Sequence, residues 1–573
     1  MPEAEMARVE NEFDICREAI YSNDYYDLIV DYLGAYSIGE PACIQSINDK
    51  YDIAYYSRKN IPPLNLQDYL YQAIPKCLAL TDQSALEVSG ILRLQNQTVL
   101  DLRGQGVLIG FVDTGIDYEN RAFRNTDGST RIVGIWDQTI EEGTPPRGFL
   151  YGAFYDESQI NEALQSDAPK EVVLSTDTNG HGTFLAGVAC GSEDATEDFS
   201  GAAPLASIAV VKCKEAKQNL RDFYFIPDDV PAFQENDVMA AMEWLNRYAS
   251  FLRMPLIICI GMGTGMGNHA GEDPLSTLTD ELGRRRQRAV IVSTGNEANQ
   301  RHHYFQTGMT EGEVDTVEIS VGSGIPGFNM EFWASIPEIY SLTVISPSGE
   351  RLPEVGDALS NHQVYTFLFE NTTITVDYTI AGARLGGQLI YLRFEKPLAG
   401  IWTLRITARQ VINGTFHCWL PISTFSWGEM FFLRSNPDTT ILAPGMSQVA
   451  VTVGAYQTES GSVYPDSGRG YSTIGTVKPD ILAPGVNVYG PELKGGYGTR
   501  TGTSVAAAVT AGGCAQIFQW GIVENNMLYL NSTDLSNLLI RGAVRSPDRT
   551  YPNPAYGYGL LDVYNSLNRL RLQ

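Results

Sequence analysis

The chain has 573 residues, of which 43% are hydrophobic and 19% are charged, a composition typical of a globular protein. This length exceeds that of one ordinary domain, so we expect a large core with attached units. The 40 Lys and Arg residues and the 67 Asp and Glu residues give a formal net charge of −27, which argues against a nucleic-acid partner.

The N-terminal segment and the cysteines bear on where the protein resides. The sequence MPEAEMARVENEF is acidic and has no basic region followed by an apolar stretch, so it does not resemble a secretory signal. No later segment supplies the ~18 consecutive apolar residues of a membrane helix, and we expect a soluble protein without a membrane span. The eight cysteines are scattered and form no CxxC pair, so disulfides and a cysteine-built zinc site are both disfavoured.

Four regions follow one another along the chain. Residues 1–83 combine a helical pattern with short strand-like runs, which predicts a small α+β unit. Residues 84–301 alternate buried strand-like runs such as GVLIGFVD with longer helical stretches, which is typical of an α/β fold with a doubly wound parallel sheet. Residues 302–437 contain closely spaced strand patterns separated by turns, which favour an inserted antiparallel β-sandwich or jelly roll. The α/β pattern resumes over residues 438–573.

Three motifs place chemically active side chains at the ends of apolar segments. Asp113 ends the strand-like run of GVLIGFVDTGID, His181 lies between glycines in NGHGTFLAG, and Ser504 precedes a small-residue helix in GTSVAAAV. A carboxylate, an imidazole and a hydroxyl are the groups that nucleophilic hydrolysis by serine requires. Each residue taken alone is also typical of a turn or of a helix start, so only the combination favours catalysis.

A fourth motif, AVIVSTGNE, places Asn296 after an apolar strand, where its amide would donate hydrogen bonds to an oxyanion. Taken together, VDTGID, NGHGTFLAG, STGNE and GTSVAAA resemble the four signatures of the subtilisin family. Their order along the chain, Asp then His then Ser, is the subtilisin order. The resemblance covers about residues 84–300 and 438–573.

The resemblance implies a role for each motif residue. Asp113 orients His181, and His181 acts first as general base and then as general acid. Ser504 attacks the scissile carbonyl, and Asn296 and the backbone amide of Ser504 bind the oxyanion.

The resemblance also implies where a substrate binds. An extended substrate would pair as an added strand with the segment Gly261, Met262 and Gly263. The residues that would line the primary specificity pocket are Ser293, Thr294 and Gly295. One departure is visible, because many subtilases have Pro and His four and five residues after the nucleophile, where this chain has Ala508 and Val509.

The insertion after Asn296 and the segment IVGIWDQ resemble the Csp group of clostridial proteases, which act in spore germination by activating the zymogen of a cortex-lytic hydrolase. This resemblance implies that residues 1–83 are a prodomain that assists folding and lies bound in the active-site cleft. Gln83 precedes Asp113 by 30 residues, a separation that predicts self-cleavage between Gln83 and Ser84 with Leu80 in the fourth subsite. An uncleaved linker is the alternative.

We therefore predict a serine endopeptidase that hydrolyses protein or peptide substrates through an acyl-enzyme, without a cofactor or a metal site. Its expected location is cytoplasmic or spore-associated. The alternative is a pseudoprotease that acts as a binding or regulatory protein because its prodomain stays in the cleft. A third hypothesis makes the inserted sandwich a recognition module.

Overall fold

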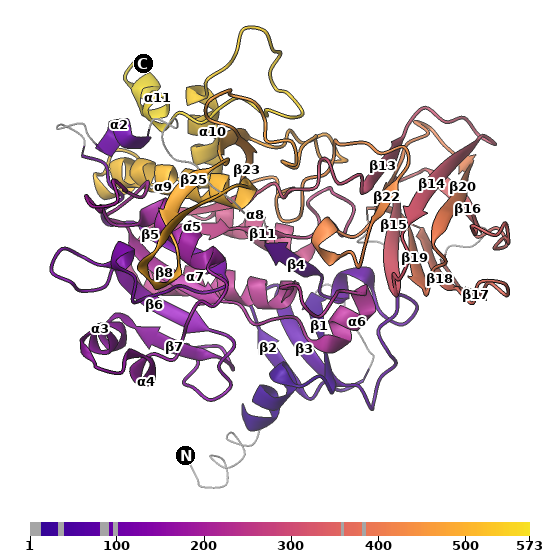
Figure 1. Cartoon of the computed structure of the whole chain (residues 1–573), viewed down its shortest axis with the longest axis horizontal. Coiled ribbons are helices and arrows are strands. Elements are labelled where there is room, and N and C mark those ends of the chain that lie inside the picture. The colour runs from indigo at the N-terminus through magenta and orange to yellow at the C-terminus, as the bar shows by residue number, and fades with distance from the viewer. Residues whose placement is uncertain are drawn as a thin grey trace.

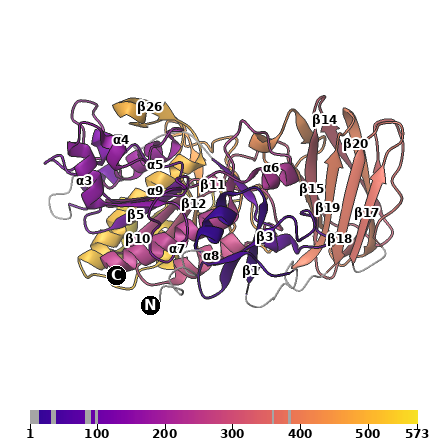
Figure 2. The same ribbon diagram turned by 90° about the horizontal axis from the view of Figure 1, so that it is seen from below.

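The computed structural model shows three adjoining regions (Figure 1, Figure 2). A large α/β body lies at one end of the long axis, a β-sandwich lies at the other end, and the N-terminal strands lie between them. The residues that the structure describes are 13–31, 39–80, 91–95, 101–356, 360–380 and 386–572.

The α/β body is built on an 8-stranded sheet in the order β24-β23-β12-β10-β5-β8-β6-β7. Its strands are β5 (Leu108–Asp113), β6 (Ile132–Asp137), β7 (Ala153–Asp156), β8 (Ser207–Lys212), β10 (Leu256–Ile260), β12 (Arg288–Ser293), β23 (Val451–Tyr456) and β24 (Ile481–Pro484). Neighbouring strands are parallel except at the edge, where β7 runs antiparallel to β6. The central strands are apolar along their whole length because both faces of the sheet are covered.

Helices cover the two faces of the sheet. Ile109 and Phe111 of β5 pack in the same apolar cluster as α5 (His181–Cys190) and α9 (Thr503–Phe518). The alternate residue Leu108 packs in a second cluster with α7 (Glu235–Leu252) and α8 (Pro274–Arg284), as expected because successive strand side chains point to opposite faces. Further α-helices are α2 (Ile91–Gln95), α3 (Glu157–Gln165), α4 (Pro169–Val172), α6 (Gln218–Tyr224), α10 (Ser532–Gly542) and α11 (Val563–Asn568).

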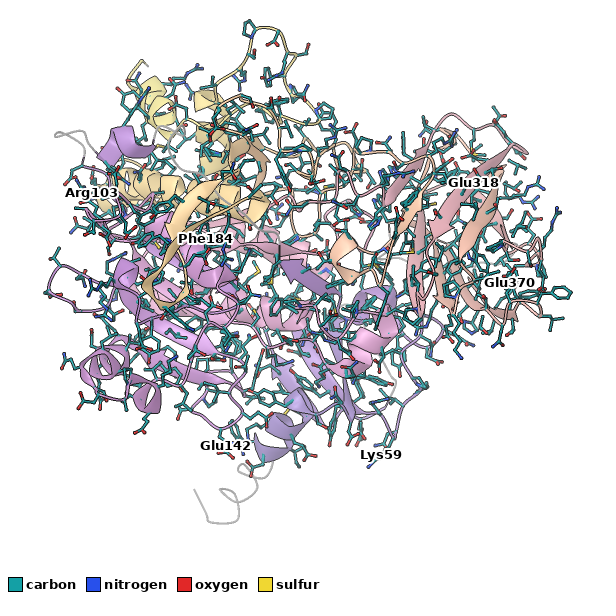
Figure 3. The ribbon with its side chains drawn as sticks, viewed as in Figure 1. Lys59, Arg103, Glu142, Phe184, Glu318 and Glu370 are labelled. Atoms are coloured by element: carbon teal, nitrogen blue, oxygen red, sulfur yellow. A yellow bond between two sulfur atoms is a disulfide. The ribbon has the colours of Figure 1, made fainter. Side chains whose placement is uncertain are left out.

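The helix that begins at Thr503 belongs to the core. Together with the π-helical turn that follows, it extends over Thr503–Val523 and is long and apolar enough to cross a membrane by length and composition alone. However, 94% of its apolar window is buried inside the protein, so its composition is explained by packing against the sheet. Phe184 of α5 likewise lies within the α/β body, whereas charged side chains such as Glu142 and Glu318 lie at the periphery (Figure 3).

The N-terminal unit is a helical segment, residues 13–21, beside a 3-stranded antiparallel sheet in the order β1-β3-β2. The strands are β1 (Tyr25–Asp31), β2 (Cys43–Ser46) and β3 (Tyr51–Ser57). Cys16 of the helix forms a disulfide with Cys43 of β2, 27 residues away. The prediction against disulfides was therefore wrong at this pair, because the sheet returns the chain to the helix and cysteine spacing alone does not reveal that return.

The chain leaves the N-terminal unit as strand β4 (Cys77–Leu80) and enters the α/β body. There β4 pairs antiparallel with β11 (Met262–Gly263) on one side and with β9 (Phe233–Gln234) on the other. Leu78 is completely buried in this position.

The inserted region is a sandwich of two antiparallel sheets, and aromatic and aliphatic side chains of both sheets fill the space between them. The 6-stranded sheet has the order β13-β21-β15-β19-β18-β17, with β13 (His303–Gln306), β15 (Gly327–Ser335), β17 (Ser360–Thr366), β18 (Thr373–Ile380), β19 (Gly387–Glu395) and β21 (Phe416–Trp419). The 4-stranded sheet has the order β16-β20-β14-β22, with β14 (Val314–Val321), β16 (Ile339–Ile345), β20 (Gly400–Gln410) and β22 (Met430–Phe432). The prediction of an α/β fold with an antiparallel insertion is thus confirmed, and the jelly-roll connectivity stays a prediction.

Candidate active site

Asp113 lies at the carboxyl end of β5, in the middle of the parallel sheet. Its side chain is 1% exposed, and its Oδ1 atom accepts hydrogen bonds from the backbone N–H of Thr114 (2.8 Å) and from Nδ1 of His181 (2.7 Å). The carboxylate is therefore fixed at the edge where open α/β sheets place their functional groups.

His181 is the first residue of α5, and the glycines around it permit close approach. A Cβ atom on Gly182 would lie 2.2 Å from the carbonyl oxygen of Gly115, so no other residue fits there. The Nε2 atom of His181 lies 3.2 Å from Oγ of Ser504. Asp113, His181 and Ser504 thus form one hydrogen-bonded line, although they lie far apart in the sequence.

Asp177 holds the start of the histidine helix, and the sequence analysis missed this residue. Its two carboxylate oxygens accept hydrogen bonds from the backbone N–H of Gly180 (2.8 Å) and from the hydroxyls of Thr114 (3.1 Å) and Thr183 (2.7 Å). Because Thr114 follows Asp113, this network connects the strand of the carboxylate to the helix of the imidazole. The signal in the sequence was an acidic residue four positions before His181 within DTNGH.

Ser504 is the second residue of α9 and is completely buried. The first turn of a helix carries unpaired backbone N–H groups and the positive end of the helix dipole. The hydroxyl of Ser504 therefore lies beside groups that would stabilise a developing negative charge on a bound carbonyl oxygen.

Asn296 lies beside this helix start. Its Oδ1 atom accepts from the backbone N–H (3.4 Å) and the hydroxyl (3.3 Å) of Thr503, the residue before Ser504. Because Oδ1 faces Thr503, the amide nitrogen of Asn296 and its two N–H donors point away from Thr503. The sequence analysis did not single out Thr503, which also accepts from the backbone N–H of Gly295 (3.0 Å).

The segment expected to pair with substrate lies against the triad. A Cβ atom on Gly261 would lie 3.1 Å from Cε1 of His181 and 3.1 Å from Cβ of Ser504. The following residues, Met262 and Gly263, form β11 and pair with Leu80 and Ala79 of the N-terminal chain. The edge that is expected to pair with substrate is thus occupied by β4, whereas the predicted junction of Gln83 and Ser84 lies outside the described residues.

Two cysteine thiols near the site do not compete with Ser504 as nucleophiles. Cys213 and Cys259 are buried beside Asp113, and burial raises the pKa of each thiol well above its ordinary value, with the Asp113 charge adding to the effect. Both groups stay protonated at neutral pH, and a thiol is a poor nucleophile in that state.

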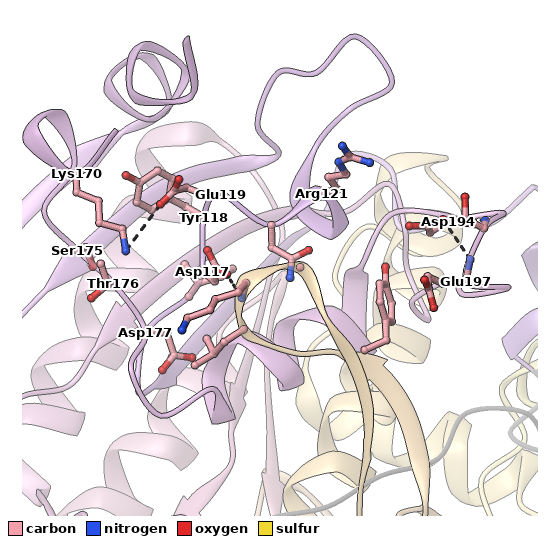
Figure 4. Close-up of a pocket in the computed structure, with 17 residues that line it drawn as sticks. Asp117, Tyr118, Glu119, Arg121, Lys170, Ser175, Thr176, Asp177, Asp194 and Glu197 are labelled. Atoms are coloured by element: carbon pink, nitrogen blue, oxygen red, sulfur yellow. Dashed lines mark hydrogen bonds and ion pairs between the residues drawn. The ribbon is translucent and has the colours of Figure 1, made fainter. Parts of the chain in front are cut away.

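A cavity of about 680 Å³ lies next to the loop that precedes His181 (Figure 4). Carboxylates predominate over cations in its lining, and Glu119 lies 3.9 Å from the ammonium of Lys170. Its charged residues are Asp117, Glu119, Arg121, Lys170, Asp177, Asp194, Glu197 and Lys494. The lining touches the triad only indirectly, through Asp177, so the cavity adjoins the site of bond cleavage and is not that site. Within the described ranges, no group of three or more His, Cys, Asp and Glu side chains is arranged to hold a metal ion.

A buried carboxylate, imidazole and hydroxyl in one hydrogen-bonded line, with amide donors beside the hydroxyl, define the active site of a serine hydrolase. The model of the subtilase family matches residues 104–323 and 425–559, more than half of the chain, and the protein belongs to that family.

Known relatives agree with this assignment. The chain is 34% identical to the serine protease AprX of Bacillus subtilis over 155 residues, which cover 23% of this chain and 33% of AprX. It is 29% identical to the subtilisin-like protease SBT2.2 of Arabidopsis thaliana over 126 residues, 19% of this chain and 15% of that protein. The matches therefore span a third or less of these curated relatives.

Similarity to a solved structure extends over most of the chain. The CspB protease of Clostridium perfringens superposes with a TM-score of 0.75 at 28% identity, over 84% of this chain and 96% of that chain. The predicted resemblance to subtilases, and within them to the Csp group, is confirmed by this similarity together with the family match.

Proposed function

We propose that the protein is a serine endopeptidase that hydrolyses peptide bonds of protein substrates. The observation that carries the proposal is the hydrogen-bonded line from Asp113 through His181 to Ser504, at 2.7 and 3.2 Å. The other structural support is that strand β11, next to these three residues, pairs with the extended segment β4 of the same chain.

The proposed reaction has two steps. In the first, Oγ of Ser504 attacks the scissile carbonyl carbon while Nε2 of His181 takes the hydroxyl proton, and the oxyanion is held by the Ser504 backbone N–H and the Asn296 amide. His181 then gives that proton to the leaving amine, so the C–N bond breaks and an ester to Ser504 remains. In the second step, water gives a proton to His181 and attacks the ester, and His181 returns the proton to the Ser504 oxygen as the acid is released.

Residues 1–83 would act as a prodomain that the enzyme cleaves from itself. The support is that β4 lies between β11 and β9 in the position of an added substrate strand. By the resemblance, the cleaved bond would follow Gln83, which lies outside the described residues. By the resemblance to the Csp group, the physiological substrate would be the zymogen of a spore cortex-lytic hydrolase, and the enzyme would be cytoplasmic or spore-associated.

A second candidate function, a regulatory protein with a permanently blocked cleft, is favoured by one specific observation. The N-terminal unit is held by buried ion pairs, such as that of Asp27 with Lys217 of the α/β body, and not only by β4. The two side chains are 4% and 2% exposed, so release of the unit would break this pair and expose the apolar surface around it to water.

Intact mass and N-terminal sequencing of purified wild type and Ser504→Ala separate the two functions. If the enzyme matures itself, the wild type splits in the segment after β4 and the variant stays whole. If both stay whole and a fluorophosphonate does not label Ser504 in the wild type, the endopeptidase proposal is wrong and the blocked protein is favoured.

A further inference from the structure

We infer that this enzyme cleaves after residues with small side chains, because Leu442 fills the pocket that would receive the side chain of the cleaved residue. The inference rests on the proposed function and names its substrate class. The cleaved residue is the one whose carbonyl Ser504 attacks.

The geometry around Gly261 identifies which substrate position is cleaved. Gly261 lies next to both His181 and Ser504, since a Cβ atom added to it would lie 3.1 Å from Cε1 of His181 and 3.1 Å from Cβ of Ser504. A substrate that pairs antiparallel with β11 therefore presents to Ser504 the residue that lies opposite Gly261. In the specificity pocket that the resemblance implies, the side chain of that residue would enter between two backbone walls, one formed by residues 261–263 and the other by residues 293–295.

Leu442 occupies the space between these walls. A Cβ atom on Gly295 would lie 2.4 Å from Cγ and 2.5 Å from Cδ1 of Leu442, and a Cβ atom on Gly263 would lie 2.8 Å from Cβ of Leu442. A Cβ atom on the glycine of either wall would thus clash with Leu442, because real Cβ atoms essentially never lie within 3.0 Å of such an atom. Both glycines are needed for Leu442 to fit, and the volume that they leave free is taken by its isobutyl group.

The backbone holds Leu442 in this place. Its N–H donates to the carbonyl of Thr294 in one wall (2.9 Å), and the next residue, Ala443, exchanges hydrogen bonds of 2.8 and 3.1 Å with Thr264, which follows the other wall. Leu442 is 3% exposed and packs with the cluster that joins the N-terminal unit to the sandwich. A side chain fixed by both walls and by this cluster does not move aside for a large substrate group, because protein interiors are close-packed.

A small pocket bears on where the enzyme cleaves itself. Leu80 pairs with Met262 and Ala79 with Gly263, so β4 runs in the direction of Gly261. The side chain of Gln83 is too long for a small pocket. The inference therefore disfavours the cleavage after Gln83 that the resemblance implies and favours cleavage after a shorter residue.

The test compares Ala-Ala-Leu-Ala and Ala-Ala-Leu-Phe p-nitroanilides as substrates of the wild type, of Leu442→Ala and of the matched control Ile441→Ala. Ile441 is the adjacent residue and is completely buried, so the control removes similar apolar volume from the same segment. Discrimination in apolar pockets is about 10 to 200-fold per methylene group. For the wild type, we expect kcat/KM to be at least about 100-fold higher for the Ala substrate than for the Phe substrate. Leu442→Ala should reduce this ratio by about tenfold or more. Ile441→Ala should leave the ratio unchanged.

The outcomes separate the pocket from the proposed function. Equal cleavage of the Ala and Phe substrates by the wild type, or an equal loss of discrimination in both variants, overturns the role of Leu442 and leaves the peptidase intact. Hydrolysis of neither substrate, without fluorophosphonate labelling of Ser504, overturns the peptidase itself. Intact mass of the matured wild type gives an independent readout, since a new N-terminus that follows a residue with a short side chain supports the small pocket and one at Ser84 contradicts it.

Discussion

The buried pair of Asp27 and Lys217 should decide how firmly the N-terminal unit is attached. Asp27 lies on β1, and its two oxygens accept hydrogen bonds from the ammonium of Lys217 and from the amide of Gln234 (3.1 Å) in the α/β body. The ammonium also donates to the carbonyl of Ala19 (2.7 Å) in the N-terminal helix. One cation therefore joins the α/β body to both the helix and the sheet of the N-terminal unit.

The change Asp27→Asn removes the negative charge without removing volume. It leaves the Lys217 ammonium buried without its counter-charge, and breaking a buried pair in this way costs about 3 to 5 kcal/mol. Since about 1.4 kcal/mol is a tenfold change in an equilibrium constant, the opening equilibrium of the N-terminal unit should rise by between about a hundredfold and a few thousandfold.

Hydrogen exchange measured by mass spectrometry on the full chain reports this opening as faster exchange of the β1 and β3 amides. The background should be Ser504→Ala, so that self-cleavage does not change the species. The double change Asp27→Leu with Lys217→Met serves as the matched control, because replacing both charges by apolar groups should restore most of the protection. Exchange in Asp27→Asn within about threefold of the parent would refute the reasoning, since it corresponds to less than about 1 kcal/mol.

Three further predictions concern the site and its surroundings. Asp113→Asn should lower kcat by about 10⁴-fold with little change in KM, because an amide no longer holds His181 in the tautomer that accepts the Ser504 proton; a loss below tenfold would contradict this role. Glu331 accepts hydrogen bonds from the hydroxyl of Tyr71 (2.6 Å) in the N-terminal segment and from the backbone N–H of Gly267 (2.9 Å), just beyond β11. Because this carboxylate would help to position β11, Glu331→Gln should raise KM for the Ala peptide several-fold at nearly constant kcat. A drop confined to kcat would argue against a positioning role for Glu331. Burial lowers the pKa of His269 to about 4, so below about pH 6.5 the unfolded chain binds a proton on this residue that the folded chain does not bind. The contribution of His269 to stability should be full above about pH 6.5 and fall by about 1.4 kcal/mol per pH unit down to about pH 4. Thermal unfolding of the wild type and of His269→Asn measures this effect, and the same pH dependence of stability in both proteins would count against it.

The sequence revealed the parts of the site that sit at the ends of long buried segments. Asp113 and Asn296 follow strands of the central sheet, and His181 and Ser504 start helices made largely of small residues. Parallel strands bring their carboxyl ends to one edge, so motifs read separately along the chain were expected to meet there. The structure does bring these side chains together. Asp113, His181 and Ser504 lie within hydrogen-bonding distance of one another along one line.

The parts that the sequence did not reveal depend on pairing between distant short segments. The strand β11 has 2 residues and β4 has 4, lengths at which an alternating pattern carries no signal. The edge strand β7 is similarly short. It runs antiparallel to β6, whereas the sequence analysis predicted a parallel sheet. Leu442 lies in an irregular segment after the insertion, and only the tertiary structure shows that its side chain meets Gly263 and Gly295.

The place of the insertion explains how a sandwich at one end of the molecule bears on chemistry in the α/β body. The first sandwich strand begins at His303, soon after Asn296, and the last ends at Phe432, shortly before Leu442. Glu297, the neighbour of Asn296, accepts hydrogen bonds from the backbone N–H (3.1 Å) and the hydroxyl (2.7 Å) of Ser423, in the segment between β21 and β22.

The two ends of the insertion therefore lie close in sequence to residues with proposed roles, one to Asn296, the proposed oxyanion donor, and the other to Leu442, the proposed floor of the specificity pocket. Because interiors transmit small displacements instead of absorbing them, a change in how the sandwich packs on the α/β body should reach Asn296 and Leu442 together. Variation in the sandwich would on this reasoning alter turnover and substrate choice, whereas an insertion at a distant loop would alter only stability.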